Sequence, residues 1–186
     1  MGSDDAELMH RWRRGDACAF SELVERWQQP VARFVFRLTG RAALVPDLCQ
    51  EVFLRLYQAG ARYREAGAIA PWLYRIALNV ARDALRRHRH QPPPLADREP
   101  PDPAASAEAL CQRRELADVV ARAVAELPPQ LREVLALRHD EDMSFEEMAR
   151  VLGTPASTLK SRFAAALHRL RDRLHELGWS FEESAP

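Results

Sequence analysis

The chain has 186 residues, in which 27 lysines and arginines balance 27 aspartates and glutamates, so its formal net charge is zero. Alanine and leucine are abundant, only seven residues are glycine and strand-like alternation is scarce, which argues against a β-rich fold and predicts an all-α protein. Zero net charge, taken alone, argues against a nucleic-acid-binding protein. Because the sequence has neither a signal peptide nor a long apolar run, it predicts a soluble, cytoplasmic chain with no membrane insertion of its own.

The distribution of charge changes this interpretation. Eight arginines and only two acidic residues lie between positions 55 and 91, and six basic residues and one acidic residue lie between 150 and 174. The stretch from 92 to 147 instead has six arginines and thirteen acidic residues. The neutral total therefore conceals two basic segments, each a candidate nucleic-acid surface, separated by an acidic one.

The cysteines indicate neither a metal site nor disulfide bonds. Cys18, Cys49 and Cys111 are widely spaced and odd in number, and no histidine lies near them at ligand spacing. Nor does the sequence show a nucleophile motif or a phosphate-binding loop. We therefore expect a protein that is not an enzyme and that needs no metal and no cofactor.

Apolar residues recur at helical spacing through the first half of the chain. The predicted elements are a helix from Ala19 with a break or new start at Pro30 and an end at Gly40, a helix beginning near Asp47, a loop over 59–70 and a helix from Pro71 to about Arg87. The residues before Ala19 are polar and predict a loose approach to the first helix.

A proline-rich segment then interrupts the helical pattern. Residues 90–105 include six prolines and almost no large apolar side chains, so they bury too little surface to become ordered. We predict an acidic linker at 91–105 that joins two small helical domains, 1–90 and 106–186. The helical patterns that follow the linker cover 106–126 and 130–138.

Two further helical patterns, separated by a tight turn, lie between Ser144 and Leu174. Ser144 and Glu147 form a capping box that predicts a helix start, Gly153 suits a left-handed helix end, and Thr154 is a candidate cap for the next helix. The apolar stripe of that helix consists of Leu159, Phe163, Leu167, Leu170 and Leu174. Its exposed front is predicted to carry Ser157, Thr158, Lys160, Ser161 and Arg162. This is the helix-turn-helix arrangement of DNA recognition, with a helical hairpin that has a solvated basic face as the alternative.

Three segments together resemble a known family. Residues 45–57, 70–90 and 127–163 resemble, in this order, segments of bacterial sigma factors of the sigma-70 family. The short form with two domains and a linker resembles the extracytoplasmic-function group, and the resemblance extends from Phe20 to Leu174. It implies a sigma2-like helical bundle before the linker and a sigma4-like helix-turn-helix bundle after it.

The resemblance also implies partners and roles for individual residues. The partners would be core RNA polymerase (the clamp helices of its largest subunit and the β-subunit flap), promoter DNA and an anti-sigma factor. The residues expected to bind the clamp helices are Asp47, Gln50, Glu51 and Phe53. Those expected at the downstream promoter element are Tyr63, Arg64, Asn79, Arg82, Arg86 and Arg87. The upstream, minus-thirty-five element would be contacted by Ser157, Thr158, Lys160, Ser161 and Arg162.

Several points stay open at this level. Ala164, Ala165 and Ala166 stand where the family often has polar or basic residues, which implies thinner contacts with the upstream element. Trp72 and Tyr74 are candidates for DNA-melting wedges, although Trp72 fits a core position better and Tyr74 is undecided. Two functional alternatives remain: a sigma-like decoy that sequesters an anti-sigma factor, and a stand-alone helix-turn-helix regulator.

Overall fold

A computed structural model describes residues 4–60, 69–88 and 119–178, and all regular structure in these ranges is helical, which confirms the predicted all-α fold. The first helical group contains α1 (Asp5–Arg13), α2 (Ala17–Thr39), the 3-10 turn η1 (Ala42–Leu44), α3 (Val45–Gly60) and α4 (Ile69–Arg87). The second helical group contains a helix over 119–126, α6 (Pro129–Leu135), the π-helical turn η2 (Ala136–Asp140), α7 (Phe145–Leu152) and α8 (Ala156–Glu176). The predicted linker lies outside the described residues, so the domain limits stay predictions.

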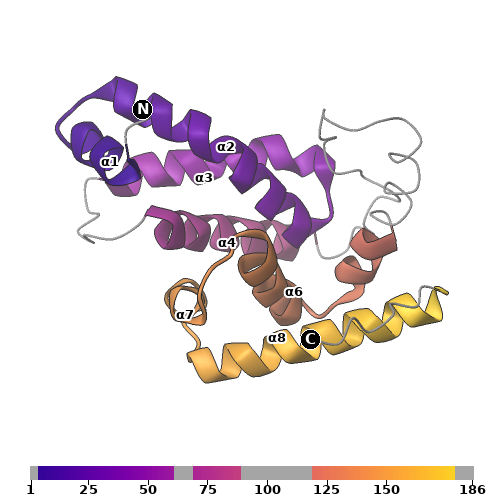
Figure 1. Cartoon of the computed structure of the whole chain (residues 1–186). Helices are drawn as coiled ribbons and strands as arrows, with labels where there is room; N and C mark the ends of the chain where they lie inside the picture. Colours follow the sequence, from indigo (N-terminus) through magenta and orange to yellow (C-terminus); the bar gives the residue numbers. More distant parts are fainter. Residues whose placement is uncertain (1–3, 61–68, 89–118, 179–186) are drawn as a thin grey trace, which may run out of the picture.

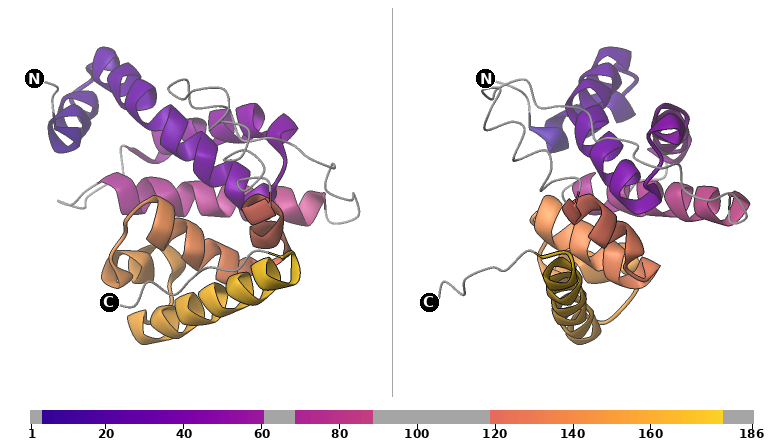
Figure 2. Two further views of the ribbon diagram at one scale, coloured as in Figure 1. Left: turned by 45° about the vertical axis from the view of Figure 1, so that its right-hand side comes forward. Right: turned by 90° about the vertical axis from the view of Figure 1, so that its right-hand side faces the viewer.

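The two helical groups pack directly against each other. α2, α3 and α4 contact one another, and α6 and α7 pack on the side formed by α2 and α4. α8 lies beyond α6 and α7, on their far side from α2 and α4 (Figures 1 and 2). The arrangement therefore places the second helix of the predicted helix-turn-helix on the outside of the molecule.

One long helix replaces the break expected at Pro30. α2 runs without interruption from Ala17 to Thr39, and Asp16 caps it by accepting hydrogen bonds from the amides of Cys18 and Ala19 at 3.0 and 3.3 Å. Proline removes one helical hydrogen bond. However, Leu23 and Val31 on either side of it are completely buried. The burial of apolar residues along the whole helix outweighs that loss, which the local sequence pattern does not reveal.

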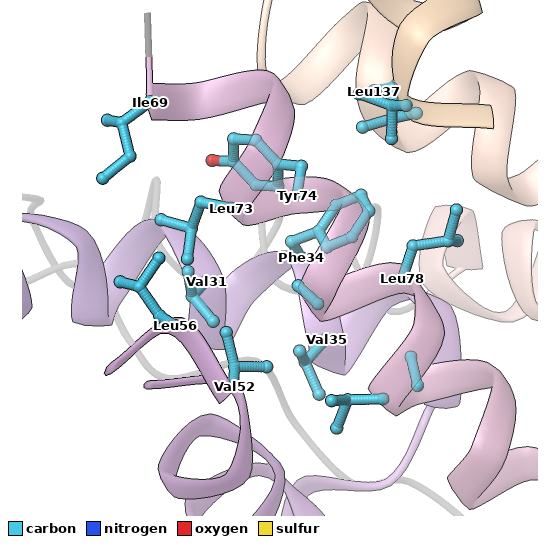
Figure 3. Packing of buried hydrophobic residues seen from close by; sticks show 14 of the residues in the cluster. Val31, Phe34, Val35, Val52, Leu56, Ile69, Leu73, Tyr74, Leu78 and Leu137 are labelled. Carbon is cyan, nitrogen blue, oxygen red and sulfur yellow. The ribbon is translucent and has the colours of Figure 1, made fainter. Parts of the chain in front are cut away.

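One hydrophobic cluster contains residues of both helical groups. Tyr74 of α4 is 1% exposed, and its ring lies 4.9 Å from that of Phe34 and 5.9 Å from that of Trp27. Leu137 of η2 belongs to the same buried cluster, and Figure 3 shows it on the second-group side of the Tyr74 and Phe34 rings. Apolar burial thus holds the second group on α4, in addition to the hydrogen bonds described below.

The helix-turn-helix forms largely as its local sequence predicts. The Ser144 hydroxyl accepts from the Glu147 amide at 3.2 Å, and the Ser144 amide donates to the Glu147 carboxylate at 2.9 Å, which completes the capping box. Gly153 ends α7 at φ +63°. The predicted cap at Thr154 is wrong, because Pro155 holds the cap position and the Thr154 hydroxyl donates backwards to the carbonyl of Leu152.

The capping box gives a direct test of local stability. We expect Ser144→Ala to lower the free energy of unfolding by about 1 kcal/mol, because it leaves a first-turn amide of α7 without its acceptor. The matched control is Ser21→Ala, whose hydroxyl is exposed and only donates to the Ala17 carbonyl within α2. Urea denaturation would measure both changes, and equal losses would contradict a specific role for the cap.

Candidate nucleic-acid and polymerase-binding surfaces

The front of α8 is open to solvent. Ser157, Thr158, Lys160 and Ser161 are exposed and Arg162 is half-buried. All of these residues except Lys160 line a shallow groove together with Leu131 of α6 and Ala165. The structure therefore brings together the hydroxyl, ammonium and guanidinium donors that the sequence placed on this face, in a form suited to phosphates and base edges.

Lys160 is positioned by an aromatic side chain. Its Nζ lies 5.7 Å from the ring centre of Phe145, the first residue of α7, and the Arg138 guanidinium carbon lies 5.5 Å from the same ring. Phe145 in turn packs edge-on against Phe163 of α8, with ring centres 6.1 Å apart. A cation that rests on a ring is restrained in direction, so Phe145 links the start of α7 to the proposed DNA-reading face.

The alanine run after Arg162 divides into two parts. Ala164 and Ala165 are exposed, whereas Ala166 is completely buried beside Leu127 and Leu135. Leu167, expected in the apolar stripe, is instead 43% exposed. Only the first two alanines therefore leave the outer surface without polar groups, and the third is a core residue.

Three of the predicted downstream-element residues on α4, Asn79, Arg82 and Arg86, share one face. Asn79, Arg82, Arg86 and Arg87 are all exposed. Arg86 is paired with Asp83 on the same helix, and this hydrogen bond holds the pKa of the Asp83 carboxyl below its ordinary value. Arg82 instead makes its ion pair with the second helical group, at Glu133. Tyr63 and Arg64 lie outside the described residues.

Tyr74 and Trp72, the two candidate wedges, differ in burial. Tyr74 is buried in the core and donates its hydroxyl hydrogen bond to Glu141 of the second helical group. Trp72 is partly buried and packs against the same core cluster. Neither ring stands free on the α4 surface.

The exposed side of α3 carries acidic, amide and apolar side chains. Asp47 and Gln50 are exposed, whereas Glu51 is half-buried and accepts from Arg55 at 2.7 Å. Phe53 is 9% exposed and lies in the core, so its side chain supports α3 from within.

Sequence reasoning missed two residues of this surface. Leu54 is 49% exposed and Tyr57 is 58% exposed. They follow Asp47 and Gln50 at helical intervals of three and four residues, so all four lie along one side of α3. Tyr57 also contacts Trp12 and Phe20, with ring centres 5.9 and 5.1 Å away. The sequence held a signal for this, because Leu54 and Tyr57 are spaced to lie on the same side of the helix as the polar residues Asp47 and Gln50.

Other kinds of site are not apparent in the part of the chain that the structure describes. Within 4–60, 69–88 and 119–178, no three histidine, cysteine, aspartate or glutamate side chains are grouped to hold a metal ion. Burial raises the pKa of the Cys49 thiol to about 11, which disfavours the reactive thiolate. None of the described helices combines the length and apolar character needed to cross a membrane.

Comparison with known proteins identifies the family. Residues 23–91 match the family model for sigma-70 region 2, and residues 117–170 match that for sigma-70 region 4. The ECF RNA polymerase sigma-E factor of Escherichia coli (strain K12) is 33% identical over 187 residues, covering 93% of this chain and 95% of the relative. The chain belongs to the sigma-70 family, in its extracytoplasmic-function group. The RNA polymerase sigma-H factor of Pseudomonas aeruginosa is 31% identical, with the same coverage.

Two solved structures share the fold. CnrH, solved in complex with the cytosolic domain of CnrY, has a TM-score of 0.72 and 27% identity, covering 92% of this chain and 97% of that chain. The sigma factor RpoE of Bartonella quintana, solved with the anti-sigma factor NepR, has a TM-score of 0.65 and 20% identity, covering 84% of this chain and 96% of its own. At 20% identity, the similarity to RpoE supports a shared fold and nothing more.

Proposed function

We propose that this sigma-family protein binds core RNA polymerase, directs it to bipartite promoters and promotes DNA opening at the start of transcription. The observation that carries the proposal is the presence of region 2 and region 4 in one chain, each with an exposed face of polar and basic side chains. The protein has no catalysis of its own and acts in the cytoplasm. The domain limits proposed for it are 1–90, 91–105 for the linker and 106–186.

The proposed contacts follow the exposed side chains of each group. α8 binds the upstream element through Lys160 and Arg162, with hydroxyl contacts from Ser157, Thr158 and Ser161. α4 binds the downstream element through Asn79 and the arginines 82, 86 and 87, to which the sequence adds Tyr63 and Arg64. α3 binds the clamp helices through Asp47, Gln50 and Glu51, with Phe53 as internal support.

Leu54 and Tyr57 extend the proposed polymerase surface. Exposed apolar side chains beside acidic and amide groups are typical of a helix that meets a partner protein. An anti-sigma factor is proposed as a second protein partner. CnrH was solved in complex with the cytosolic domain of CnrY, and the sigma factor RpoE of Bartonella quintana was solved in complex with the anti-sigma factor NepR.

Reconstitution tests the proposed function as a whole. The purified chain would be combined with core polymerase and a promoter library, and both complex formation and the sequences at which transcripts start would be measured. Specific initiation is the expected result. Binding to an anti-sigma factor without any binding to core polymerase would instead identify a decoy, and DNA binding alone would identify a stand-alone regulator.

Substitutions on α8 test the upstream contacts separately. We expect Lys160→Ala and Arg162→Ala each to weaken binding of upstream-element DNA about tenfold and to reduce the salt dependence by about one unit per lost phosphate contact. Affinity for core polymerase should not change. Arg14→Ala, which removes an exposed positive charge at the end of α1, is the matched control. Loss of polymerase binding by the α8 variants would show that these side chains are structural.

A further inference from the structure

Arg82 is occupied by a carboxylate of the second helical group. Its Nε and Nη2 donate to the two carboxylate oxygens of Glu133, both at 2.7 Å. The side chain of Glu133 is only 9% exposed, whereas that of Arg82 is 44% exposed. A guanidinium fork binds carboxylates and phosphates in the same bidentate geometry, so Glu133 takes the donors that a DNA phosphate would use.

This ion pair is one of several contacts made by the same part of the second group. Arg132, the residue before Glu133, donates from Nη1 to the carbonyl of Leu38 near the end of α2, at 2.9 Å. Further along, Glu141 accepts from the hydroxyl of Tyr74 on α4. Apolar residues of the second group complete the contact, because Leu137 lies in the cluster that contains Tyr74. Glu133 is therefore held at Arg82 by surrounding packing.

We call the arrangement in which the second helical group packs on α2 and α4 the closed form. It affects the two proposed DNA faces differently. α8 lies on the outside of the molecule (Figure 2), and Ser157, Thr158, Lys160 and Ser161 of its front are exposed. On α4, the pair with Glu133 occupies Arg82 at the centre of a face that also carries Asn79 and Arg86. A promoter strand that follows this face would meet α6 at the position of Arg82.

We infer that α6 is an internal competitor for nucleic acid, in which Glu133 holds Arg82 in the closed form. Binding of the downstream element through Arg82 then requires α6 to leave α4. The inference rests on the proposed role of α4 in DNA binding. When only a fraction of molecules is open, the apparent affinity of the ligand falls by that fraction. Weakening the pair should therefore tighten DNA binding without any change in the DNA-binding residues.

Glu133→Gln in the full chain tests the competition. It removes the negative charge and keeps the side-chain shape, so small-angle X-ray scattering should show a larger radius of gyration. Affinity for a labelled random-sequence single-stranded DNA should rise about tenfold, as expected for loss of one charge-assisted pair. The control is Glu126→Gln, because Glu126 pairs with Arg173 inside the second group at 2.7 Å. It should change neither measurement. An unchanged affinity for the single-stranded DNA in Glu133→Gln would overturn the inference.

Exchanging the charges of Arg82 and Glu133 tests the ion pair without using DNA. Glu133→Arg should open the molecule, and the double variant Arg82→Glu, Glu133→Arg should return the scattering profile to that of the closed form. Circular dichroism would check that helix content is kept in each variant. Failure of the exchange to restore closure, with helix content intact, would contradict the ion-pair latch.

Different results would contradict the competition by α6 and the proposed role of α4 in DNA binding. Adding Arg82→Ala to Glu133→Gln should abolish the gain in DNA affinity. If the opened variant gains no affinity but still loses binding with Arg82→Ala, α6 is not a competitor. If Arg82→Ala has no effect on DNA binding in the opened variant, the role proposed for Arg82 is wrong, whatever the scattering shows.

Discussion

Tyr74→Ala is expected to lower the free energy of unfolding by about 4 kcal/mol, the range of large-to-small aromatic changes in protein cores. Tyr74 is 1% exposed, and its ring contacts Phe34 and Trp27 edge-on. Its removal leaves a cavity between the two helical groups and deprives the half-buried Glu141 carboxyl of its hydroxyl donor. Urea denaturation followed by circular dichroism would measure the change.

The control for this prediction is Tyr57→Ala. Tyr57 is 58% exposed, and its ring contacts Trp12 and Phe20 at the edge of the first group, so we expect its replacement to cost about 1 kcal/mol. A loss of similar size for both tyrosines would show that burial at the contact between the groups contributes little to stability.

Tyr74→Phe separates the hydroxyl group from the ring. Burial raises the pKa of Glu141 above its ordinary value, and the hydrogen bond from Tyr74 partly offsets this by stabilising the carboxylate. A carboxyl group with a raised pKa favours the folded state while it is protonated, so its contribution is full below the unfolded pKa and is lost as pH rises through the folded pKa. Without the hydroxyl, the pKa of Glu141 should rise further, so the loss of stability with rising pH should be larger and should extend to higher pH. Identical pH profiles for the two proteins would contradict the role of the hydrogen bond.

Features that depend on a few neighbouring residues were predictable from the sequence. The capping box of Ser144 and Glu147 and the left-handed glycine at 153 satisfy backbone groups within one turn, so local chemistry decides them. The exposed front of α8 followed from the helical period in the same way. The predicted cap at Thr154 was wrong because α8 begins one residue later than expected. Pro155 holds the cap position, directly before the first helical residue.

Features that depend on distant residues were not predictable in this way. Pro30 lies inside α2 because tertiary burial on both sides of it exceeds the cost of a lost hydrogen bond. Helical spacing put Tyr74 on α4 but did not show whether another element would cover it. Glu133 was one acidic residue among many, and its pairing with Arg82, 51 positions away, appears only when α6 packs on α4. Sequence periodicity places a residue on a face, whereas packing determines what that face meets.

Arg132→Ala is the second change with a large expected effect, about 3 kcal/mol of unfolding free energy. The guanidinium donates to Val124 and Leu127 at 3.2 and 3.0 Å, and also to Ala125, where the helix over 119–126 ends. It reaches the first group as well, at the carbonyl of Leu38. These carbonyls lie at the C-terminal ends of two helices, where partial negative charge gathers, so one cation compensates both.

Burial lowers the pKa of Arg132, yet a guanidinium stays protonated across the ordinary pH range, so the loss in Arg132→Ala should not depend on pH. Arg132→Lys keeps the charge but cannot direct a planar fork at carbonyls from two helices, and we expect it to recover less than half of the stability. Arg150→Ala, which removes an exposed charge from α7, should cost less than 0.5 kcal/mol, roughly the effect of an ordinary surface substitution. Full recovery by lysine would mean that charge alone matters at this position. Partial recovery would show that the geometry of the fork holds the ends of α2 and the 119–126 helix together, and with them the closed arrangement that presents Glu133 to Arg82.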